Sequence, residues 1–448
     1  MKTFFFYDLE TSGLKPKDDR IMQFAGQRTD MELNPVGEPV NVLVKMTNDA
    51  LPSPGAINVT GITPQQTLMD GISEAEFCKY VTEEIFVPDT IAVGYNTVRF
   101  DDEFMRACLW RNFYDPYEWE WKDGRGRWDI LDVVRLTRAL RPEGINWPFR
   151  EDGAPTNRLE LITKLNGVSH EHAHDALSDV YATIAVAKLI RERQPDLFKY
   201  LLSMRGKNEI KRLVNLDNKQ PFVYASGRFE NEFNKATVAF PIAPGRNGNL
   251  LVFDLRYNLE ELLQNEDADN GKNMFYPIVK ELCFNKCPAV APLSVLEKAD
   301  GWNKIKLSRD LIEQNLRVLL AHPEFAEQMR EEYENRPEFP PAEEPEGAIY
   351  DGFLNDADRV KVAVVRNAEP SKLVDLNLEF DDERLPDLLL HYKGRNFPET
   401  LSESEMKQYE DYRKNRLSKQ LPKFMAEIEK VQDDFVKQEL LLYLQSLS

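Results

Sequence analysis

The chain has 448 residues and is acidic, with 57 Lys and Arg against 76 Asp and Glu and a formal net charge of −19. This balance excludes a protein that binds polyanions over its whole surface, but it leaves room for a local basic groove. The length predicts two or three domains. No apolar run is long enough to span a membrane and the first residues lack a secretory signal, so we expect a soluble, cytoplasmic protein.

Residues 1–195 alternate strand-like and helix-like segments, which predicts a mixed α/β domain. The expected strands are residues 4–9, 21–31, 39–46 and 90–96. The expected helices, where apolar residues recur at helical spacing, are residues 75–86, 99–113 and 175–193.

The pattern changes after residue 195. Short apolar runs separated by Gly, Pro and Asn predict a small β-rich domain over residues 196–345. Its expected strands are residues 221–226, 237–242, 249–255 and 286–293. Residues 336–347 are rich in proline and glutamate, which is typical of an extended linker. Helical periodicity with alternating charge then predicts a helical domain over residues 350–448.

The four cysteines are too few and too scattered for a disulfide framework. They are Cys78, Cys108, Cys283 and Cys287. The last two alone do not complete a zinc site. We interpret all four as reduced thiols, most of them in cores.

The first expected strand ends in two acids one residue apart. Because alternate side chains of a strand share a face, Asp8 and Glu10 are expected to point the same way as Phe4 and Phe6. Like charges this close raise each other's pKa unless a cation lies between them, and a divalent cation is the usual solution. Alternatively, the two acids are solvated residues at a strand edge.

Two further acids favour a site. Asp101 follows a buried strand at the expected start of a helix, where an ordinary helix N-terminal charge is the alternative. Asp179 lies inside an expected helix, and its neighbours on that face are the small Ala176 and Ala182. A carboxylate in that position is poorly explained as core, so a polar group should approach it closely.

These acids carry a resemblance. Asp8 and Glu10 in DLETSG, Asp101 in NTVRFDDE, and the segment from His174 to Asp179 resemble, in that order, the three motifs of the DEDDh family of 3′→5′ exonucleases. The similarity is stronger still to the bacterial exodeoxyribonuclease I branch of that family and covers essentially the whole chain. It extends through TGITP (60–64), GYNTVRFDDE (94–103), NFYDPY (112–117), ALRPEGINWP (139–148), AHDALSDVYATIA (173–185), NKCP (285–288) and NFPETL (396–401).

The resemblance implies a ribonuclease H-like mixed-sheet exonuclease domain, then an SH3-like β-rich domain and a C-terminal helical domain. It implies processive degradation of single-stranded DNA from the 3′ end to 5′-mononucleotides, in DNA repair and recombination, within a C-shaped channel. It also implies docking of the acidic C-terminal tail of single-stranded-DNA-binding protein, with Arg141 and Tyr200 as contributors. We expect a monomer.

Phosphodiester hydrolysis needs an activated water and a stabilised leaving oxygen, which two Mg²⁺ ions roughly 4 Å apart supply. Carboxylate oxygens are the ligands that such ions need, and Mn²⁺ is a substitute. We predict that Asp8 bridges the two ions and that Asp101 holds the second one. Glu10 and Asp179 are predicted to complete the first site.

His174 is the predicted general base, because imidazole titrates near the working pH. A zinc cluster is the alternative, since His170, His172 and His174 alternate in SHEHAHD. No cysteine lies nearby and the acids supply oxygen ligands, which favours the catalytic interpretation. His322 and His391 lie outside the motifs and are interpreted as surface or packing residues.

Substrate contacts are also predicted from the resemblance. Thr11, Gly61 and Ile62 match the parts that hold the 3′-terminal nucleotide, with an ordinary turn as the alternative. Arg158 is a further predicted substrate-binding residue, and Arg99 is expected to pair with phosphate.

Additional phosphate-pairing charge is expected from Arg125, Arg127 and residues 204–212. The aromatic residues within 112–128 either stack on bases or form core.

Two other functions stay open. A relative that trims RNA or proofreads for a polymerase would not need the two additional domains. A non-catalytic single-strand-binding adaptor would be expected to lose a metal ligand, whereas every predicted ligand is present.

Overall fold

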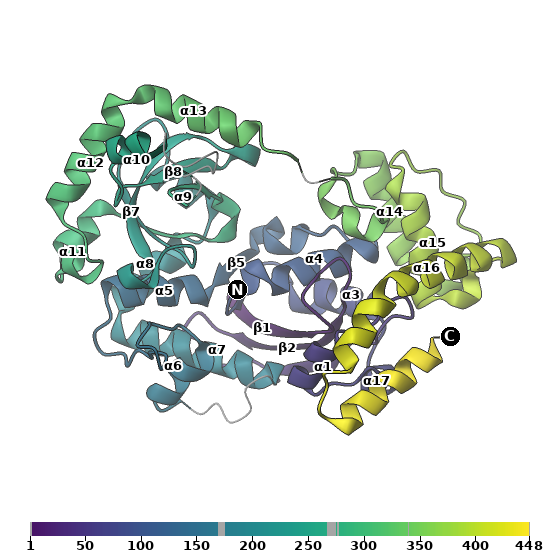
Figure 1. Cartoon of the computed structure of the whole chain (residues 1–448). Coiled ribbons are helices and arrows are strands. Elements are labelled where there is room, and N and C mark those ends of the chain that lie inside the picture. Colours follow the sequence, from purple (N-terminus) through teal and green to yellow (C-terminus); the bar gives the residue numbers. More distant parts are fainter. Residues whose placement is uncertain (1, 169–174, 267–274, 276, 339, 448) are drawn as a thin grey trace.

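The structure is a computed structural model that describes residues 2–168, 175–266, 275, 277–338 and 340–447. Three regions follow one another along the chain (Figure 1). We call the part from β1 to α7 the first region, the part from α8 to α13 the second region, and the part from α14 to α17 the third region. None of the described helices combines the length and the apolar character that a membrane span requires.

The first region is built on a mixed sheet with strand order β3-β2-β1-β4-β5. Its strands are β1 (Thr3–Thr11), β2 (Ile21–Thr29), β3 (Val40–Leu43), β4 (Thr90–Gly94) and β5 (Gly126–Asp129). β2 runs antiparallel to β1 and β3, whereas β4 and β5 run parallel to β1. The predicted mixed α/β domain is therefore confirmed.

The described part of the first region contains seven α-helices. They are α1 (Pro54–Thr60), α2 (Pro64–Asp70), α3 (Glu74–Tyr80), α4 (Asp101–Arg111), α5 (Ile130–Leu140), α6 (Leu159–Leu165) and α7 (Ala176–Arg193). Phe4 and Phe6 belong to a hydrophobic cluster with residues of α5 and α7, whereas Phe5 and Tyr7 belong to a cluster with residues of α3 and α4. β1 therefore alternates between two cores, as predicted.

The second region contains an antiparallel sheet with strand order β10-β6-β7-β8-β9. Its strands are β6 (Phe222–Ala225), β7 (Ala236–Pro244), β8 (Leu250–Asp254), β9 (Val279–Leu282) and β10 (Ala289–Pro292). Its helices are α8 (Pro195–Ser203), α9 (Lys207–Leu213), α10 (Leu259–Glu266), α11 (Gly301–Lys304), α12 (Arg309–Ala321) and α13 (Pro323–Glu334). β9 was not predicted, because two charged residues interrupt its four positions.

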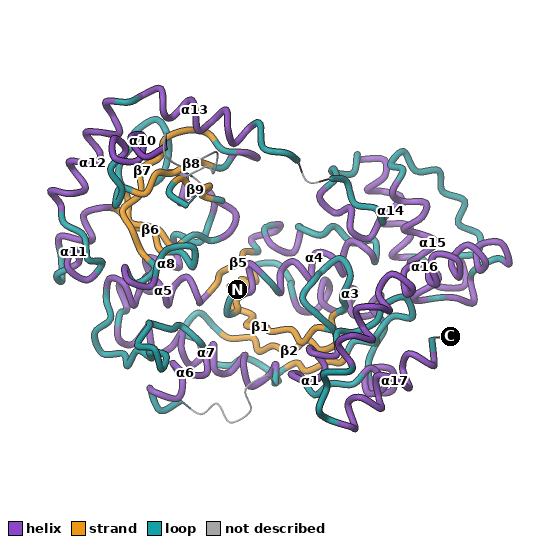
Figure 2. The backbone as a smooth tube through the Cα atoms, viewed as in Figure 1, coloured by secondary structure: helices purple, strands orange, loops and turns teal. Residues whose placement is uncertain are grey.

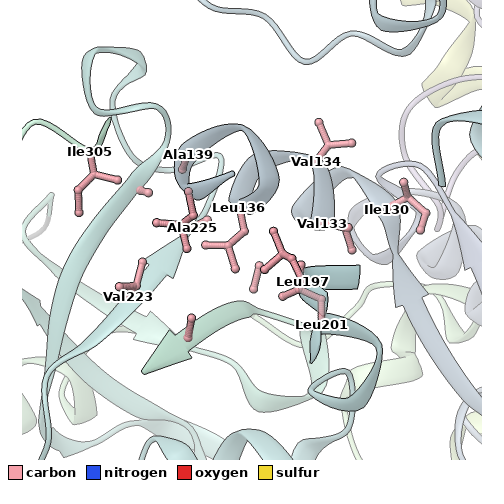
Figure 3. Packing of buried hydrophobic residues seen from close by; sticks show 14 of the residues in the cluster. Ile130, Val133, Val134, Leu136, Ala139, Leu197, Leu201, Val223, Ala225 and Ile305 are labelled. Carbon is pink, nitrogen blue, oxygen red and sulfur yellow. The ribbon is translucent and has the colours of Figure 1, made fainter. Parts of the chain in front are cut away.

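The first and second regions share one hydrophobic cluster. Figure 3 shows apolar side chains of α5, among them Val133 and Leu136, beside Leu197 and Leu201 of α8 and Val223 of β6. α5 also packs against β10. This continuous core fixes the second sheet against the first region.

The third region is helical, as predicted. Its helices are α14 (Asp356–Asn367), α15 (Arg384–Asn396), α16 (Glu403–Ile428) and α17 (Asp434–Ser446). The described residues between α13 and Glu344 form no helix or strand, and Figure 2 shows them as a loop that crosses from the second region to the third. α16 and α17 pack back against α1.

Candidate active site

Three carboxylates meet between β1 and α7. One oxygen from each of Asp8, Glu10 and Asp179 lies within 4.8 Å of the other two, and all three side chains are half-buried. α7 lies against β1 and β2. It begins after Asp175, whose side chain accepts a hydrogen bond from the Ser178 N–H at 3.0 Å. This cap fixes the first turn of α7 and so places Asp179 opposite β1.

A fourth carboxylate joins them from the start of α4, the helix that follows the neighbouring strand β4. Asp101 begins α4 a few residues after β4, which pairs in parallel with β1. It is buried, and its carboxylate accepts a hydrogen bond from the Leu9 N–H at 3.1 Å. Because Leu9 lies between Asp8 and Glu10, this bond holds Asp101 beside the pair on β1.

The electrostatics of this acidic cluster favour a bound cation. Burial and the surrounding carboxylates raise the pKa of Asp8 well above its usual value. Burial, and then repulsion from Asp179 and Asp175, raise the pKa of Glu10 to about 8. Carboxylates that the fold forces together are stabilised by divalent ions, and their hard oxygens suit such ions. The donor set therefore fits an acidic metal site.

Two further acids were not singled out from the sequence. Asp129, at the end of β5, accepts hydrogen bonds from the N–H groups of Asn96 and Leu131, both at 2.9 Å. Burial, and then repulsion from Asp132, raise its pKa to about 7. The second of these acids is Asp132. The segment RWDILD at residues 127–132, which has two acids at the end of a short apolar stretch, is the sequence signal that could have identified both.

Arg99 is tied to these acids. Its guanidinium lies 2.7 Å from Asp132 and 3.6 Å from Asp129, and its side chain is 35% exposed. These two carboxylates therefore orient the Arg99 guanidinium, which was predicted to contact phosphate, and its side chain stays partly open to solvent.

Arg127 has a different role from the one predicted. It is buried, paired with Asp102 and lies 3.1 Å from Glu120. The Tyr7 hydroxyl donates to Asp102 at 2.5 Å. Arg127 also donates to the Asn285 carbonyl in the second region at 2.6 Å. The prediction that Arg127 contacts phosphate is wrong, because its guanidinium is committed to this buried network.

Arg125 is also engaged within the protein. Its Nε donates to the Phe86 carbonyl at 2.5 Å, and its guanidinium lies 3.1 Å from Asp123. The aromatic segment is mostly core: Phe113, Trp119 and Trp128 are buried, whereas Trp121 is 65% exposed.

The remaining predicted substrate residues are spread around the end of β1. Thr11 is buried, and its hydroxyl donates to the Gly13 carbonyl at 2.7 Å. Gly61 follows α1 with φ of 71°, and a Cβ added there would meet nothing within 4 Å. Ile62 is buried in a cluster with α16 and α17 residues. Arg158 is exposed and pairs with Glu160 at 2.7 Å.

His174 lies outside the described residues, as do His170 and His172, so their predicted roles stay predictions. Of the other two histidines, His391 is buried and its Nδ1 lies 2.6 Å from Glu346, which makes it a packing residue of an ion-pair network. All four cysteines are free, and Cys78 and Cys108 are buried.

A cavity of about 1540 Å³ lies among the three regions. Its wall includes four residues that follow the end of β1, three of the second region and one of α16. They are Lys15, Lys17, Asp18, Asp19, Lys207, Arg246, Lys286 and Arg416. Its lining contains nine Lys and Arg and seven Asp and Glu. In a chain with an excess of acids, this lining is the local basic surface that the composition allowed.

Comparisons with known proteins agree with this architecture. Family models match residues 5–187 (Exonuclease), 205–335 (Exonuclease I SH3-like domain) and 343–448 (Exonuclease I C-terminal domain). The fold and the acidic site thus define a DEDD-type exonuclease with an SH3-like and a C-terminal domain.

The chain is 41% identical over 444 residues to exodeoxyribonuclease I of Haemophilus influenzae, which covers 96% of this chain and 93% of the relative. It is 40% identical over 425 residues to exodeoxyribonuclease I of Escherichia coli K12, over 92% of this chain and 89% of the relative. The chain belongs to the exodeoxyribonuclease I family.

Solved structures are similar over the full chain. E. coli exonuclease I in complex with a dA16 oligonucleotide superposes with a TM-score of 0.93 at 37% identity, and each chain is covered completely. Another structure of exonuclease I superposes with a TM-score of 0.90 at 37% identity, over 100% of this chain and 98% of that chain. That structure suggests how processivity is achieved in exonuclease I. A structure of SSB/exonuclease I in complex with an inhibitor superposes with a TM-score of 0.90 at 36% identity, and the match covers both chains completely.

Proposed function

We propose that this chain is a processive 3′→5′ exonuclease that degrades single-stranded DNA to 5′-mononucleotides in DNA repair and recombination, in the cytoplasm. One observation carries the proposal: Asp8, Glu10, Asp101 and Asp179 converge near the end of β1. Lys15, in the wall of the large cavity, follows four residues after that strand. The family membership supports the same activity.

The four acids are proposed to hold two Mg²⁺ ions, with Mn²⁺ as a substitute. Asp8 would bridge both sites, Glu10 and Asp179 would complete one, and Asp101 would hold the other. When bound, the ions activate the attacking water and stabilise the leaving oxygen. His174 would accept the proton of that water.

The protein itself supplies the fixed geometry. The Leu9 N–H holds the Asp101 carboxylate, and the Asp175 cap holds the first turn of α7. These bonds keep the acids in place at little reorganisation cost, which is the condition for effective electrostatic catalysis.

The substrate strand is proposed to place its 3′-terminal nucleotide against Thr11, Gly61 and Ile62. Arg99 and Arg158 would pair with its phosphates. The strand would continue through the cavity among the three regions. Because protein surrounds that cavity on several sides, release of the strand between cleavage events would be slow, which supports processivity.

The acidic tail of single-stranded-DNA-binding protein is proposed to dock at Arg141 and Tyr200. Both lie at the boundary of the first two regions, where Arg141 donates to the Val295 carbonyl at 3.2 Å and Tyr200 to the Val290 carbonyl at 3.1 Å. We propose a monomer.

We further propose domains at residues 1–195, 196–345 and 350–448. The first two contain the ranges that their family models match, and the third match begins slightly earlier, at residue 343.

The test is a time course on a 5′-labelled single-stranded oligodeoxynucleotide, with duplex and RNA equivalents alongside, in Mg²⁺ and in EDTA. Shortening of single-stranded DNA from its 3′ end in Mg²⁺ alone is expected. Preferred cleavage of RNA would favour the trimming alternative. Tight binding of intact DNA would favour the adaptor.

A further inference from the structure

Three buried polar side chains are joined to one another next to the acidic cluster. They are Tyr7 of β1, Asp102 of α4 and Arg127 of β5, each at most 7% exposed. Because alternate side chains of a strand point to opposite faces, Tyr7 points away from the face that Asp8 and Glu10 share. We call Tyr7, Asp102 and Arg127 the support network.

Two hydrogen bonds tie the first turn of α4 to β1. The Tyr7 hydroxyl donates to the Asp102 carboxylate at 2.5 Å. The Leu9 N–H donates to the Asp101 carboxylate at 3.1 Å. The two donors are the chain neighbours of Asp8, and the two acceptors are the first residues of α4. The spacing between the Asp8 and Asp101 carboxylates therefore depends on both bonds.

The two carboxylates that these bonds hold together repel each other. Burial, and then repulsion from Asp101, raise the pKa of Asp8 well above its usual value. Like charges in a buried site move apart unless the surrounding structure holds them. The bond between Tyr7 and Asp102 opposes that movement through chain neighbours of the two acids, so it acts on their spacing from outside the acidic cluster.

Arg127 connects this arrangement to the second region. Its guanidinium pairs with Asp102 and lies 3.1 Å from Glu120. It also donates to the Asn285 carbonyl at 2.6 Å, and the Cys287 thiol donates to the Arg127 carbonyl at 3.5 Å. Both of these partners lie between β9 and β10. The planar fork of arginine makes several such bonds at once, so the second region holds Arg127 and Arg127 holds Asp102.

We propose that the support network positions the Asp8 and Asp101 carboxylates for divalent ions, and that the second region contributes to this positioning through Arg127. The inference rests on the proposed function, in which Asp8 bridges two ions and Asp101 holds one of them. Tyr7, Asp102 and Arg127 act through these neighbouring acids and are therefore positioning residues. Loss of a partner that orients a metal ligand typically weakens metal binding or activity about 10–100-fold.

The test measures metal binding by the full chain without DNA. The probe is Mn²⁺, and the loss of the electron paramagnetic resonance signal of the free ion reports how much is bound. Tyr7→Phe removes only the hydroxyl of this buried side chain. It should raise the Kd for Mn²⁺ about tenfold, because the first turn of α4 loses one of its two ties to β1. A purely structural role would lower the thermal midpoint and leave the Kd as in the wild type.

Tyr443→Phe is the matched control. Tyr443 is as buried as Tyr7, and its hydroxyl donates to the Thr47 carbonyl at 3.0 Å. It belongs to the hydrophobic cluster that contains residues of α16 and α17. The control removes the same hydroxyl group from a different core, so it should lower the thermal midpoint and leave the Kd for Mn²⁺ unchanged.

Arg127→Lys tests the contribution of the second region. Lysine keeps a positive charge for Asp102, but it lacks the fork that also reaches Asn285. This variant should also raise the Kd for Mn²⁺ about tenfold. A wild-type Kd here, together with a raised Kd in Tyr7→Phe, would overturn the role of the second region.

Cleavage assays add a second readout. Both variants should need about tenfold more Mg²⁺ for half of the maximal rate. Excess Mg²⁺ should restore kcat to within about threefold of the wild type, and KM for the oligonucleotide should change by less than about threefold. A kcat that stays low in excess Mg²⁺ would contradict an effect through metal affinity.

The outcomes separate the two proposals. Cleavage by the wild type, together with wild-type Mn²⁺ affinity in both variants, would overturn the support network alone. Weaker Mn²⁺ binding by both variants, without cleavage by the wild type, would support the network and overturn the nuclease. Absence of both Mn²⁺ binding and cleavage in the wild type would overturn both proposals.

Discussion

Two clusters of buried charge differ in composition. Among the residues that the structure describes, the acidic cluster of the active site brings together the carboxylates of Asp8, Glu10, Asp101 and Asp179. The second cluster, which we call the interface network, joins the first region to the third and pairs acids with arginines. Its members are Arg20, Asp49, Glu74, Arg111, Glu346, His391 and Arg395.

The pKa values of the carboxylates shift in opposite directions in the two clusters. Burial alone would raise the pKa of Glu74, but Arg111 and Arg20 lower it to about 2. Burial, and then repulsion from the neighbouring acids, raise the pKa of Glu10 to about 8. The partner, rather than burial, therefore decides whether a buried carboxylate is ionised. Acids that pair with arginines stabilise the contact between two regions, whereas acids that meet other acids favour a bound cation.

Removing Asp8 from the acidic cluster should have the largest effect on activity. Asp8→Ala is expected to lower kcat by roughly 10³-fold or more, because a ligand shared by both metal sites is lost. Oligonucleotide binding in EDTA should persist. Cleavage within tenfold of the wild-type rate would contradict the assignment of Asp8.

Removing an acid from the interface network should affect stability instead. Asp49 lies 3.0 Å from Arg20 and 3.4 Å from Arg395, and all three side chains are fully buried. Asp49→Ala leaves buried guanidiniums without this partner, which typically costs about 3–5 kcal/mol. The midpoint of thermal unfolding should fall clearly, while specific activity at low temperature stays near that of the wild type. An unchanged midpoint would show that the network does not hold the regions together.

Two histidines offer a matched pair. His174→Ala should slow turnover by roughly 10²-fold, through loss of the proposed base, and leave the thermal midpoint unchanged. His391→Ala should lower that midpoint by leaving Glu346 with fewer partners, at a cost of about 1–3 kcal/mol, and leave turnover near the wild-type value. If His174→Ala lowered the thermal midpoint and His391→Ala slowed turnover, the functions assigned to the two histidines would be reversed.

The pH dependence of stability should differ in sign between the clusters. Between pH 4.5 and about 8, the folded protein keeps a proton on Glu10 that the unfolded chain releases, so rising pH destabilises the fold. The lowered pKa of Glu74 instead adds stability above about pH 4.5, which is lost as the pH falls toward about 2.

In EDTA, the thermal midpoint is therefore expected to fall by a few degrees, roughly 2–5 °C, from pH 5 to pH 8.5. Mg²⁺ should raise it again at pH 8.5. Glu10→Gln is the control and should reduce this pH dependence. An equal decline in the wild type and in this variant would assign the effect to other groups.

Local patterns allowed much of the fold to be predicted. Three features depend only on residues that are neighbours in the chain, so they could be predicted from the sequence. They are the alternation from Phe4 to Glu10, the apolar strand before Asp101 and the helix around Asp179. β5 and β9 were missed because each has only four residues and contains charged ones. Arg127 was misassigned because its sequence neighbours do not reveal that Asp102 and Glu120 surround it.

The sequence by itself therefore determined the class of fold and the set of acids, because side-chain periodicity and residue type are local. The tertiary structure alone decided which charges meet. Asp132 holds two arginines, one of which, Arg135, lies beside Gly227 in a loop almost a hundred residues away. Arg395 reaches Asp49 from the third region. Such pairs depend on the packing of distant segments, and that packing determines which charges meet an opposite charge and which meet a like charge.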